Sequence, residues 1–197
     1  MAHIAVLGLG NWGTAVARLW LLDGHKVKGW TIEQEVYESI TMDRINKKYL
    51  PDHSVEGLEA TMRIDEALDG VEIVVLAIPS SVILDVVDDI IPHLRPGHVL
   101  IDLAKGLAPG KRLISEAINE KLVAENKHNT LAVVTGPTIA PEAAGGVITT
   151  ALVASEDESV AKRLAETLTT QTFILHSASD PVGAELWGAF KNVIALT

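Results

Sequence analysis

The chain of 197 residues contains no cysteine, so it can form neither a disulfide nor a thiolate metal site. It also lacks an excess of basic residues, because 16 Lys and Arg stand against 26 Asp and Glu, giving a formal net charge of -10. Such a charge argues against a surface for nucleic acid or for an anionic membrane. The seven histidines show no metal-ligand spacing, and we therefore expect no metal.

Long apolar runs are missing too. No run reaches the roughly 18 residues that a helix needs to cross a bilayer. The first residues lead directly into a strand-like segment, without the charged and apolar regions of a signal peptide. We expect a cytoplasmic protein, long enough for one large domain or for one domain and part of another.

The most informative segment of the sequence is a glycine-rich stretch near the N-terminus. Residues 4–7 predict a buried strand and residues 14–22 a helix, and between them Gly8, Gly10 and Gly13 fit the pattern G-x-G-x-x-G. The first glycine permits a sharp turn, the second lets a pyrophosphate approach the backbone, and the third lets the helix pack closely. The free N–H groups of the helix would then bind the phosphates. The alternative is a structural strand–turn–helix.

An acidic residue follows at the expected distance. A second strand-like run covers residues 26–31, and Glu33 lies about 20 residues after the glycines, where the dinucleotide fingerprint has its ribose carboxylate. Ile32 and Glu33 favour a free 2′-hydroxyl, so we expect NAD as cofactor, with NADP as the alternative. The other interpretation of Glu33 is a solvated charge at the start of a helix over residues 33–50.

Apolar strands alternate with amphipathic helices along the middle of the chain. Strands are predicted at residues 71–78, 99–103 and 131–135. Helices are predicted from Pro79 to residue 91 and over residues 111–123. This alternation indicates an α/β fold of Rossmann type, doubly wound, with a mainly parallel sheet and helices on both faces.

Ligands of such a sheet bind beyond the carboxyl ends of its strands. Four segments should therefore converge there: Gly8–Gly13, Pro79, Lys105 and Gly136–Thr138. The alternative for Gly136–Thr138 is a simple turn.

The remaining elements are expected to be shorter. They are a loop at residues 52–60, a strand at 61–64, a helical turn at 65–70, a flexible stretch at 141–146, strands at 148–155 and 172–176, and a helix at 157–168. Asp180 and Pro181 then predict the start of a last helix, as N-cap and first helical residue. Its apolar stripe requires a packing partner, which we expect to be missing or to come from another subunit. We expect residues 1–180 to form a nucleotide-binding domain and residues 181–197 to begin a helical C-terminal domain whose remainder is absent.

The sequence resembles the N-terminal, nucleotide-binding part of NAD(P)-dependent glycerol-3-phosphate dehydrogenase, from Gly8 to Leu196. The matching segments are GLGNWGTA at residues 8–15, YLP at 49–51, AIPS at 77–80, KG at 105–106, GPTIAPE at 136–142 and GAELWGAFKNV at 183–193. The last segment resembles the family's G-x-E-x-x-G-A-x-K-N-V helix almost letter for letter.

The resemblance implies hydride transfer between NAD(H) and sn-glycerol 3-phosphate, giving dihydroxyacetone phosphate, in the supply of glycerophospholipid precursors. It makes Lys191 the general base, which requires a lowered pKa; without the motif, a lysine on a helix is a solvated surface charge. The expected substrate contacts are Lys105, Gly136, Thr138 and Asn192. The expected cofactor contacts are Gly8, Gly10, Asn11, Trp12, Gly13, Ile32, Glu33, Pro79, Lys105, Ala140 and Glu142.

The chain departs from the family at several positions. Where many bacterial members carry an arginine that meets a 2′-phosphate, this chain has Ile32 and Glu33. The serine that often precedes Lys-Gly is Ala104. In the family a C-terminal helical domain supplies further substrate contacts, so we expect this chain alone to bind dinucleotide but to turn over poorly. For the full-length protein the resemblance implies a homodimer.

Two other functions remain open. One is a different dehydrogenase of the β-hydroxyacid superfamily, which a substrate screen would distinguish because phosphate dependence should follow Lys105. The other is a non-catalytic dinucleotide-binding module. The presence of both Lys105 and Lys191 weighs against it, since a sensor needs neither.

Overall fold

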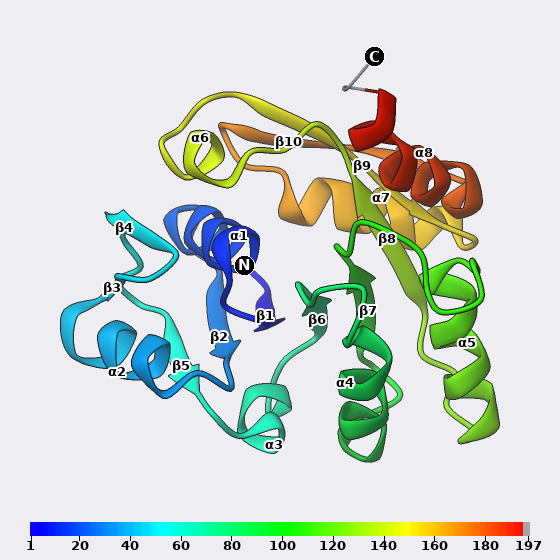
Figure 1. The fold of residues 1–197 in the computed structure, drawn as a ribbon, viewed down its shortest axis with the longest axis horizontal. Helices are drawn as coiled ribbons and strands as arrows, with labels where there is room; N and C mark the ends of the chain where they lie inside the picture. Colours follow the sequence, from blue (N-terminus) through cyan, green and yellow to red (C-terminus); the bar gives the residue numbers. More distant parts are fainter. Residues whose placement is uncertain (195–197) are drawn as a thin grey trace.

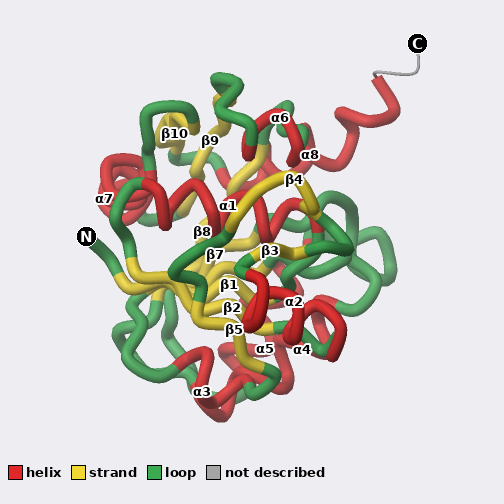
Figure 2. Tube along the Cα trace, turned by 90° about the vertical axis from the view of Figure 1, so that its left-hand side faces the viewer, coloured by secondary structure: helices red, strands yellow, loops and turns green. Residues whose placement is uncertain are grey.

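A computed structural model describes the backbone of residues 1–194 and the side chains of residues 1–190. Its centre is an eight-stranded sheet with the strand order β10-β9-β8-β7-β6-β1-β2-β5. These strands are β1 (His3–Leu7), β2 (Lys26–Trp30), β5 (Glu59–Thr61), β6 (Ile73–Leu76), β7 (Val99–Asp102), β8 (Leu131–Thr135), β9 (Thr149–Ser155) and β10 (Phe173–Ala178). The helices are α1 (Asn11–Leu22), α2 (Gln34–Asp43), α3 (Ile64–Leu68), α4 (Ile83–Ile90), α5 (Ile114–Ala124), α6 (Ala140–Ala144), α7 (Glu158–Leu168) and α8 (Pro181–Ile194). They lie on both sides of the sheet (Figures 1 and 2).

The central strands are apolar throughout because both of their faces are covered. In β1, Ile4 and Val6 belong to the core that includes residues of α1, α2 and α7. Ala5 and Leu7 belong to the opposite core, formed with α3, α4 and α5. β6 alternates in the same way between the two cores. The expected doubly wound Rossmann-type sheet is confirmed, and with it the mainly parallel strand direction.

One pair of strands breaks the parallel pattern. β8 and β9 are antiparallel, whereas β10 is parallel to β9. The last two strands therefore run against the others. Helix α8 packs on β8 and β9, where Ala184 is buried beside Val133 and Ala154 (Figure 1). Its first turn is capped as expected, since the Gly183 N–H donates to Asp180 at 2.8 Å.

The prediction of a helix over residues 33–50 is wrong for the second half of that range. α2 ends at Asp43, because Arg44 adopts a left-handed conformation with φ 59°. The chain then forms an antiparallel hairpin of β3 (Ile45–Asn46) and β4 (Leu50–Ser54). The expected loop at 52–60 contains the end of β4 and the start of β5, and the strand predicted at 61–64 ends at Thr61. Polar residues without periodicity suit a solvated helix as well as a hairpin, so the pattern did not reveal the turn.

Residues 141–146 are not the flexible stretch expected from the sequence. They contain most of α6, which packs against α1 (Figure 1). Ala140, Ala143 and Ala144 are buried there, because their small side chains let the two helices approach closely. The helices predicted from Pro79 and from residue 111 begin later, at Ile83 and Ile114.

Candidate active site

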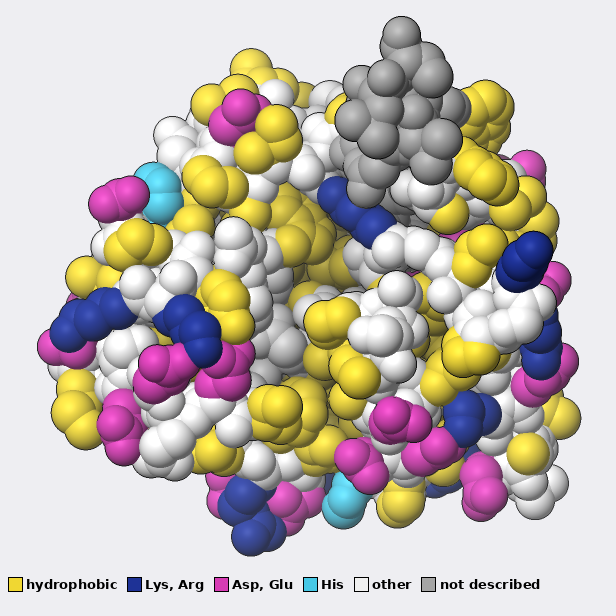
Figure 3. Space-filling model, viewed as in Figure 1, with side chains coloured by type: hydrophobic (Ala, Val, Ile, Leu, Met, Phe, Trp, Pro, Cys, Tyr) yellow, Lys and Arg dark blue, Asp and Glu magenta, His cyan; other side chains and the backbone are white. Residues whose placement is uncertain are grey.

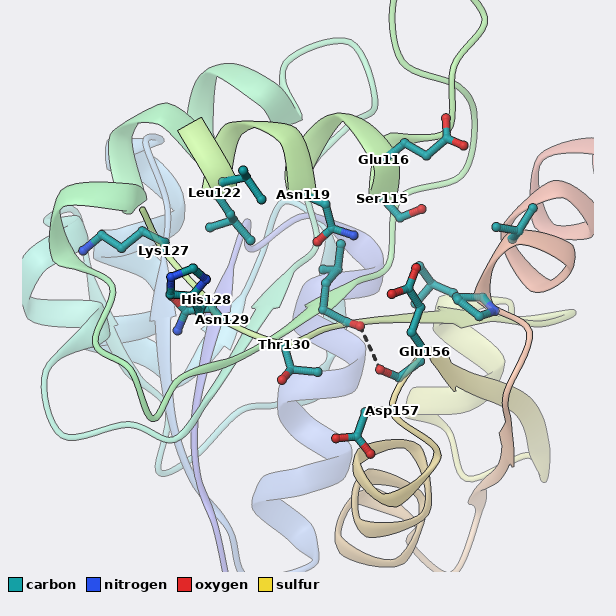
Figure 4. A pocket seen from close by; sticks show the side chains of 16 residues that line it. Ser115, Glu116, Asn119, Leu122, Lys127, His128, Asn129, Thr130, Glu156 and Asp157 are labelled. Atoms are coloured by element: carbon teal, nitrogen blue, oxygen red, sulfur yellow. Dashed lines mark hydrogen bonds between the residues drawn. The ribbon is translucent and has the colours of Figure 1, made fainter. Parts of the chain in front are cut away.

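Two pockets of similar volume compete as the binding site. One, of about 520 Å³, lies between α5, the segment before β8 and the turn before α7. Figure 4 shows its polar walls, among them Asn119, Thr130 and Asp157. It lies at the amino end of β8, whereas ligands of doubly wound sheets bind at the carboxyl ends of strands. The second pocket, of about 510 Å³, has that position. It is lined by the glycine-rich turn and by the residues that follow β2, β6 and β7.

The glycine-rich turn has the shape that a pyrophosphate requires. Gly8 has φ +98°, and a Cβ there would lie 2.5 Å from the Ala77 carbonyl oxygen. A Cβ on Gly13 would lie 1.9 Å from the Gly8 carbonyl oxygen. A Cβ on Gly10 would meet no protein atom within 4 Å. The outer glycines are therefore required by packing, while Gly10 leaves open the space into which a phosphate would fit.

Helix α1 supplies the matching electrostatics. Its N-cap is Gly10, which has no side chain, and its first turn contains no acidic residue. The N–H groups of this turn and the positive end of the helix dipole therefore meet no carboxylate of that turn, and they suit an anion. Seen from the side shown in Figure 1, the surface of the molecule is hollowed at its centre, and hydrophobic side chains line the hollow (Figure 3).

Glu33 stands at the edge of this pocket in a cluster of charged and polar groups. Its carboxylate accepts hydrogen bonds from the Lys48 ammonium and, at 2.8 Å, from the Tyr49 hydroxyl. Lys48 also bonds to Glu35. The hydrogen bonds from Lys48 and then Tyr49 hold the pKa of Glu33 below its usual value. The same carboxylates raise the pKa of Lys48. Glu33 is thus an ionised acceptor beside the pocket.

Asn46 does not line the pocket but holds its glycine-rich turn in place, a role that was not predicted from the sequence. It is fully buried in the β3–β4 hairpin, and its amide donates to the Leu9 carbonyl oxygen and to Thr14 Oγ1, both at 2.8 Å. Its own oxygen accepts from the Tyr49 N–H at 3.2 Å. Asn46 therefore joins the hairpin to the glycine-rich turn. An asparagine in a polar segment gives no signal of such a contact in the sequence.

Lys105 occupies the other end of the pocket, just beyond β7. Its ammonium lies 3.0 Å from Thr138 Oγ1 and 3.4 Å from the Thr138 carbonyl oxygen. It also lies 5.9 Å from the centre of the Trp12 ring, within the range of a cation–π contact. Residues that follow β1, β7 and β8 thus meet around one ammonium group.

Two buried carboxyl groups hold the segment that carries Lys105. At its start, Asp102 accepts from the Ala104 N–H at 2.7 Å. The pKa of Asp102 is raised to about 7, chiefly by burial; the Ala104 hydrogen bond lowers it in part, and the charge of Glu185 adds to the rise. At its end, Glu185 of α8 accepts from the Ile114 N–H at 2.6 Å and from Ser115. Because Leu113, the N-cap of α5, has no acceptor in its side chain, Glu185 caps this helix from outside.

The pocket gathers most of the expected cofactor contacts. Its lining includes Gly8, Gly10, Asn11, Trp12, Gly13, Ile32, Glu33, Pro79 and Lys105. Ala140 and Glu142 are not part of it: Ala140 is buried against α1, and Glu142 is exposed on α6. Thr138 joins the site through Lys105, and Gly136 lies at the end of β8 beside β9. The side chains of Lys191 and Asn192 lie outside the described residues, although both positions belong to α8.

The described part of the chain offers neither a metal-binding cluster nor a membrane-spanning helix. Among residues 1–190 no group of three or more His, Asp or Glu side chains could hold a metal ion. No helix over residues 1–194 is both long and apolar enough to cross a membrane.

Comparison with known proteins agrees with this geometry. The family model for the N-terminus of NAD-dependent glycerol-3-phosphate dehydrogenase matches residues 3–161. Glycerol-3-phosphate dehydrogenase (NAD(P)+) of an Exiguobacterium strain is 39% identical over 198 residues, covering 100% of this chain and 58% of the relative. The protein of the same name from Halothermothrix orenii is 36% identical, covering 98% of this chain and 56% of the relative.

A solved structure extends the likeness to three dimensions. The crystal structure of glycerol-3-phosphate dehydrogenase from Coxiella burnetii superimposes with a TM-score of 0.90 at 32% identity, over 99% of this chain and 59% of that one. The chain thus spans between half and two thirds of the length of these relatives. Since the family model covers most of its residues, the chain belongs to the family of the NAD-dependent glycerol-3-phosphate dehydrogenase N-terminus.

Proposed function

We propose that this chain binds NAD(H) in the pocket behind the glycine-rich turn and forms the cofactor-binding part of a glycerol-3-phosphate dehydrogenase. The observation that carries the proposal is the convergence at Lys105, where the glycine-rich turn and the Thr138 segment come together. A pocket for a dinucleotide alone would not require the ammonium at that end. A phosphorylated substrate explains it, because a lysine binds phosphate as a point charge.

The residues of the pocket fit the parts of a dinucleotide. The pyrophosphate would lie over Gly10 at the start of α1, as the open space there allows. Glu33 would accept a hydrogen bond from the 2′-hydroxyl of the adenosine ribose. The nicotinamide ring supplies the hydride acceptor and donor when the cofactor is bound.

The chain's own residues would orient the substrate and move its proton. Lys105 and Thr138 would bind the phosphate or hydroxyl groups of sn-glycerol 3-phosphate. Lys191 would take the proton of the C2 hydroxyl as the hydride leaves, and return it in the reverse direction. A lysine can do this only when burial or a neighbouring cation lowers its pKa, and Lys105 is a candidate for that cation. The homodimer and the cytoplasmic location stay predictions.

Calorimetric titration with NADH tests the binding step, using two glycine substitutions. Gly10→Ala places a methyl group where the phosphate would lie but meets no protein atom within 4 Å. Gly97→Ala also meets none, at a position that is not part of the pocket lining, and serves as the matched control. We expect the parent and Gly97→Ala to bind NADH equally and Gly10→Ala to bind at least tenfold more weakly. Equal binding by Gly10→Ala, or no binding by the folded parent, would refute the site.

The catalytic step is tested with a longer protein. Residues 1–197 would be joined to the remaining part of the Exiguobacterium relative, and NADH oxidation measured with dihydroxyacetone phosphate. We expect turnover by the chimaera, little by residues 1–197 alone, and a loss of a hundredfold or more in kcat for Lys191→Met. Lys105→Met should raise KM for the phosphorylated substrate. Retained kcat in Lys191→Met would reject Lys191 as the base.

A further inference from the structure

We propose that Lys48 sets how strongly this chain discriminates NADH from NADPH, by compensating the charge of Glu33 at the adenosine end of the pocket. The inference rests on the proposed binding of a dinucleotide and adds a specificity-determining residue to it. Glu33 alone predicts only a preference for a free 2′-hydroxyl. Lys48 comes from a different part of the chain, the turn of the β3–β4 hairpin. Its positive charge acts against the preference for NADH that Glu33 creates.

The geometry places the two charges within one cluster. The Lys48 ammonium bonds to both Glu33 and Glu35, so a single cation faces two carboxylates. The Glu33 side chain is 31% exposed and that of Lys48 41%, and Glu33 lines the pocket together with Tyr49. A 2′-phosphate next to Glu33 would therefore also lie near Lys48.

The hairpin holds Lys48 in a fixed relation to the phosphate end of the pocket. Asn46, two residues before Lys48, is bonded to the Leu9 carbonyl oxygen within the glycine-rich turn. Tyr49, the next residue, donates its hydroxyl to Glu33. Both backbone views place the hairpin beside α1 and α2 (Figures 1 and 2). The ammonium is thus carried by a turn whose flanking residues are hydrogen-bonded to Leu9 and Glu33 of the pocket lining.

The signs of the charges decide the direction of each effect. NADH carries no charge at the 2′ position, whereas NADPH carries a phosphate there. Glu33 repels that phosphate, while Lys48 attracts it and also offsets the charge of Glu33. Removing the carboxylate should favour NADPH, and removing the ammonium should disfavour it. NADH should respond much less to the loss of Lys48, because its 2′-hydroxyl is neutral.

Four variants of residues 1–197 test the proposal, each titrated with NADH and with NADPH at low salt. They are Lys48→Met, Glu33→Gln, the double variant, and Lys47→Met as the matched control. Lys47 lies on the same hairpin turn but pairs with Asp43 at 2.7 Å instead of with Glu33. Methionine keeps the length of the lysine side chain without its charge, and glutamine keeps an acceptor for Tyr49. Far-ultraviolet circular dichroism establishes that each variant is folded.

We expect Lys48→Met to weaken NADPH binding roughly tenfold and NADH binding little, and Glu33→Gln to strengthen NADPH binding by a similar factor. The double variant should return close to the parent's ratio of NADH to NADPH affinity. Lys47→Met should leave that ratio unchanged. The effects should shrink as salt is added.

Two results would overturn the proposal. In the first, Lys48→Met has the same ratio as the parent. In the second, Lys47→Met changes the ratio as much as Lys48→Met does, so that net charge alone is responsible. Failure of the proposed function would look different, because the parent itself would then bind neither dinucleotide.

Discussion

The two ends of the pocket use carboxylates in opposite ways. At the adenosine end, Glu33 is partly exposed, ionised and paired with Lys48. At the Lys105 end, Asp102 is 2% exposed and Glu185 5%, and no ammonium or guanidinium bonds to either within the described residues. Their partners are backbone N–H groups and the Ser115 hydroxyl.

This difference assigns the two groups of carboxylates to different roles: those at the adenosine end act on cofactor specificity, and those at the Lys105 end stabilise the fold. Charges that face water are screened, so they can be exchanged with little effect on folding while still acting on a bound anion. Buried carboxylates that accept backbone hydrogen bonds are part of the fold, because their loss leaves donors without partners. The adenosine end should therefore tolerate the loss of its charged groups, whereas the Lys105 end should not tolerate the loss of its buried hydrogen-bond acceptors.

The largest effect is expected for Glu185→Ala. The substitution leaves the buried Ile114 N–H and Ser115 without an acceptor and removes the external cap of α5, so it should lower the free energy of unfolding by about 3 kcal/mol. Urea denaturation of residues 1–197 measures the change. Glu116→Ala, which changes an exposed side chain in the first turn of the same helix, is the control. An equal, small loss of unfolding free energy in both variants would contradict the proposed difference between the two ends.

Asp102→Asn should increase stability, and only above acidic pH. Burial raises the pKa of Asp102 to about 7 in the folded chain, against about 4 when unfolded. The folded chain therefore holds the proton more tightly, and the parent loses stability as the pH rises from about 4 to 7. Asparagine has no charge to bury, so the variant should be more stable by a few kcal/mol at pH 8 and equal to the parent at pH 4.

Urea denaturation across this pH range measures the difference, with Asp89→Asn on the exposed side of α4 as the control. A difference between Asp102→Asn and the parent that does not change with pH would mean that Asp102 is not neutral in the folded chain. Asp102 would then resemble Glu33 in being ionised.

The sequence revealed the parts of both ends that depend on local pattern. The order of glycines predicted the turn at Gly8–Gly13, and apolar runs ending at Pro79 and Lys105 predicted that these residues meet at one edge of the sheet. Glu33 was found from its distance to the glycines. Each of these signals lies within a few residues or follows from the strand order of a parallel sheet.

The partners of those residues could not be predicted, because they depend on distant contacts. Glu185 caps a helix whose first N–H group lies 71 positions earlier in the chain. Asn46 reaches back 37 positions to Leu9. Neither residue type predicts such a contact, since glutamate and asparagine are usually solvated. The hairpin itself was missed because its polar sequence suited a helix, and with it the position of Lys48.

Asn46→Ala tests whether the exposed end also depends on one buried group. The substitution removes the bonds to Leu9 and Thr14, so we expect a loss of about 2 kcal/mol in the free energy of unfolding and weaker NADH binding. Thermal denaturation and calorimetry measure the two effects. Asn119→Ala, on the exposed face of α5, is the control and should change neither. Unchanged NADH affinity in Asn46→Ala would mean that the hairpin does not hold the pocket in shape.

The smallest effect on folding is expected for Lys48→Met, a variant that should nevertheless change cofactor preference. Its ammonium is exposed and faces water as well as Glu33 and Glu35, so its ion pairs contribute little to stability. We expect a melting temperature indistinguishable from that of the parent, both at low salt and at high salt. A clear drop at low salt would place Lys48 among the structural groups. The adenosine end would then combine specificity with stability, as the Lys105 end combines burial with the positioning of its lysine.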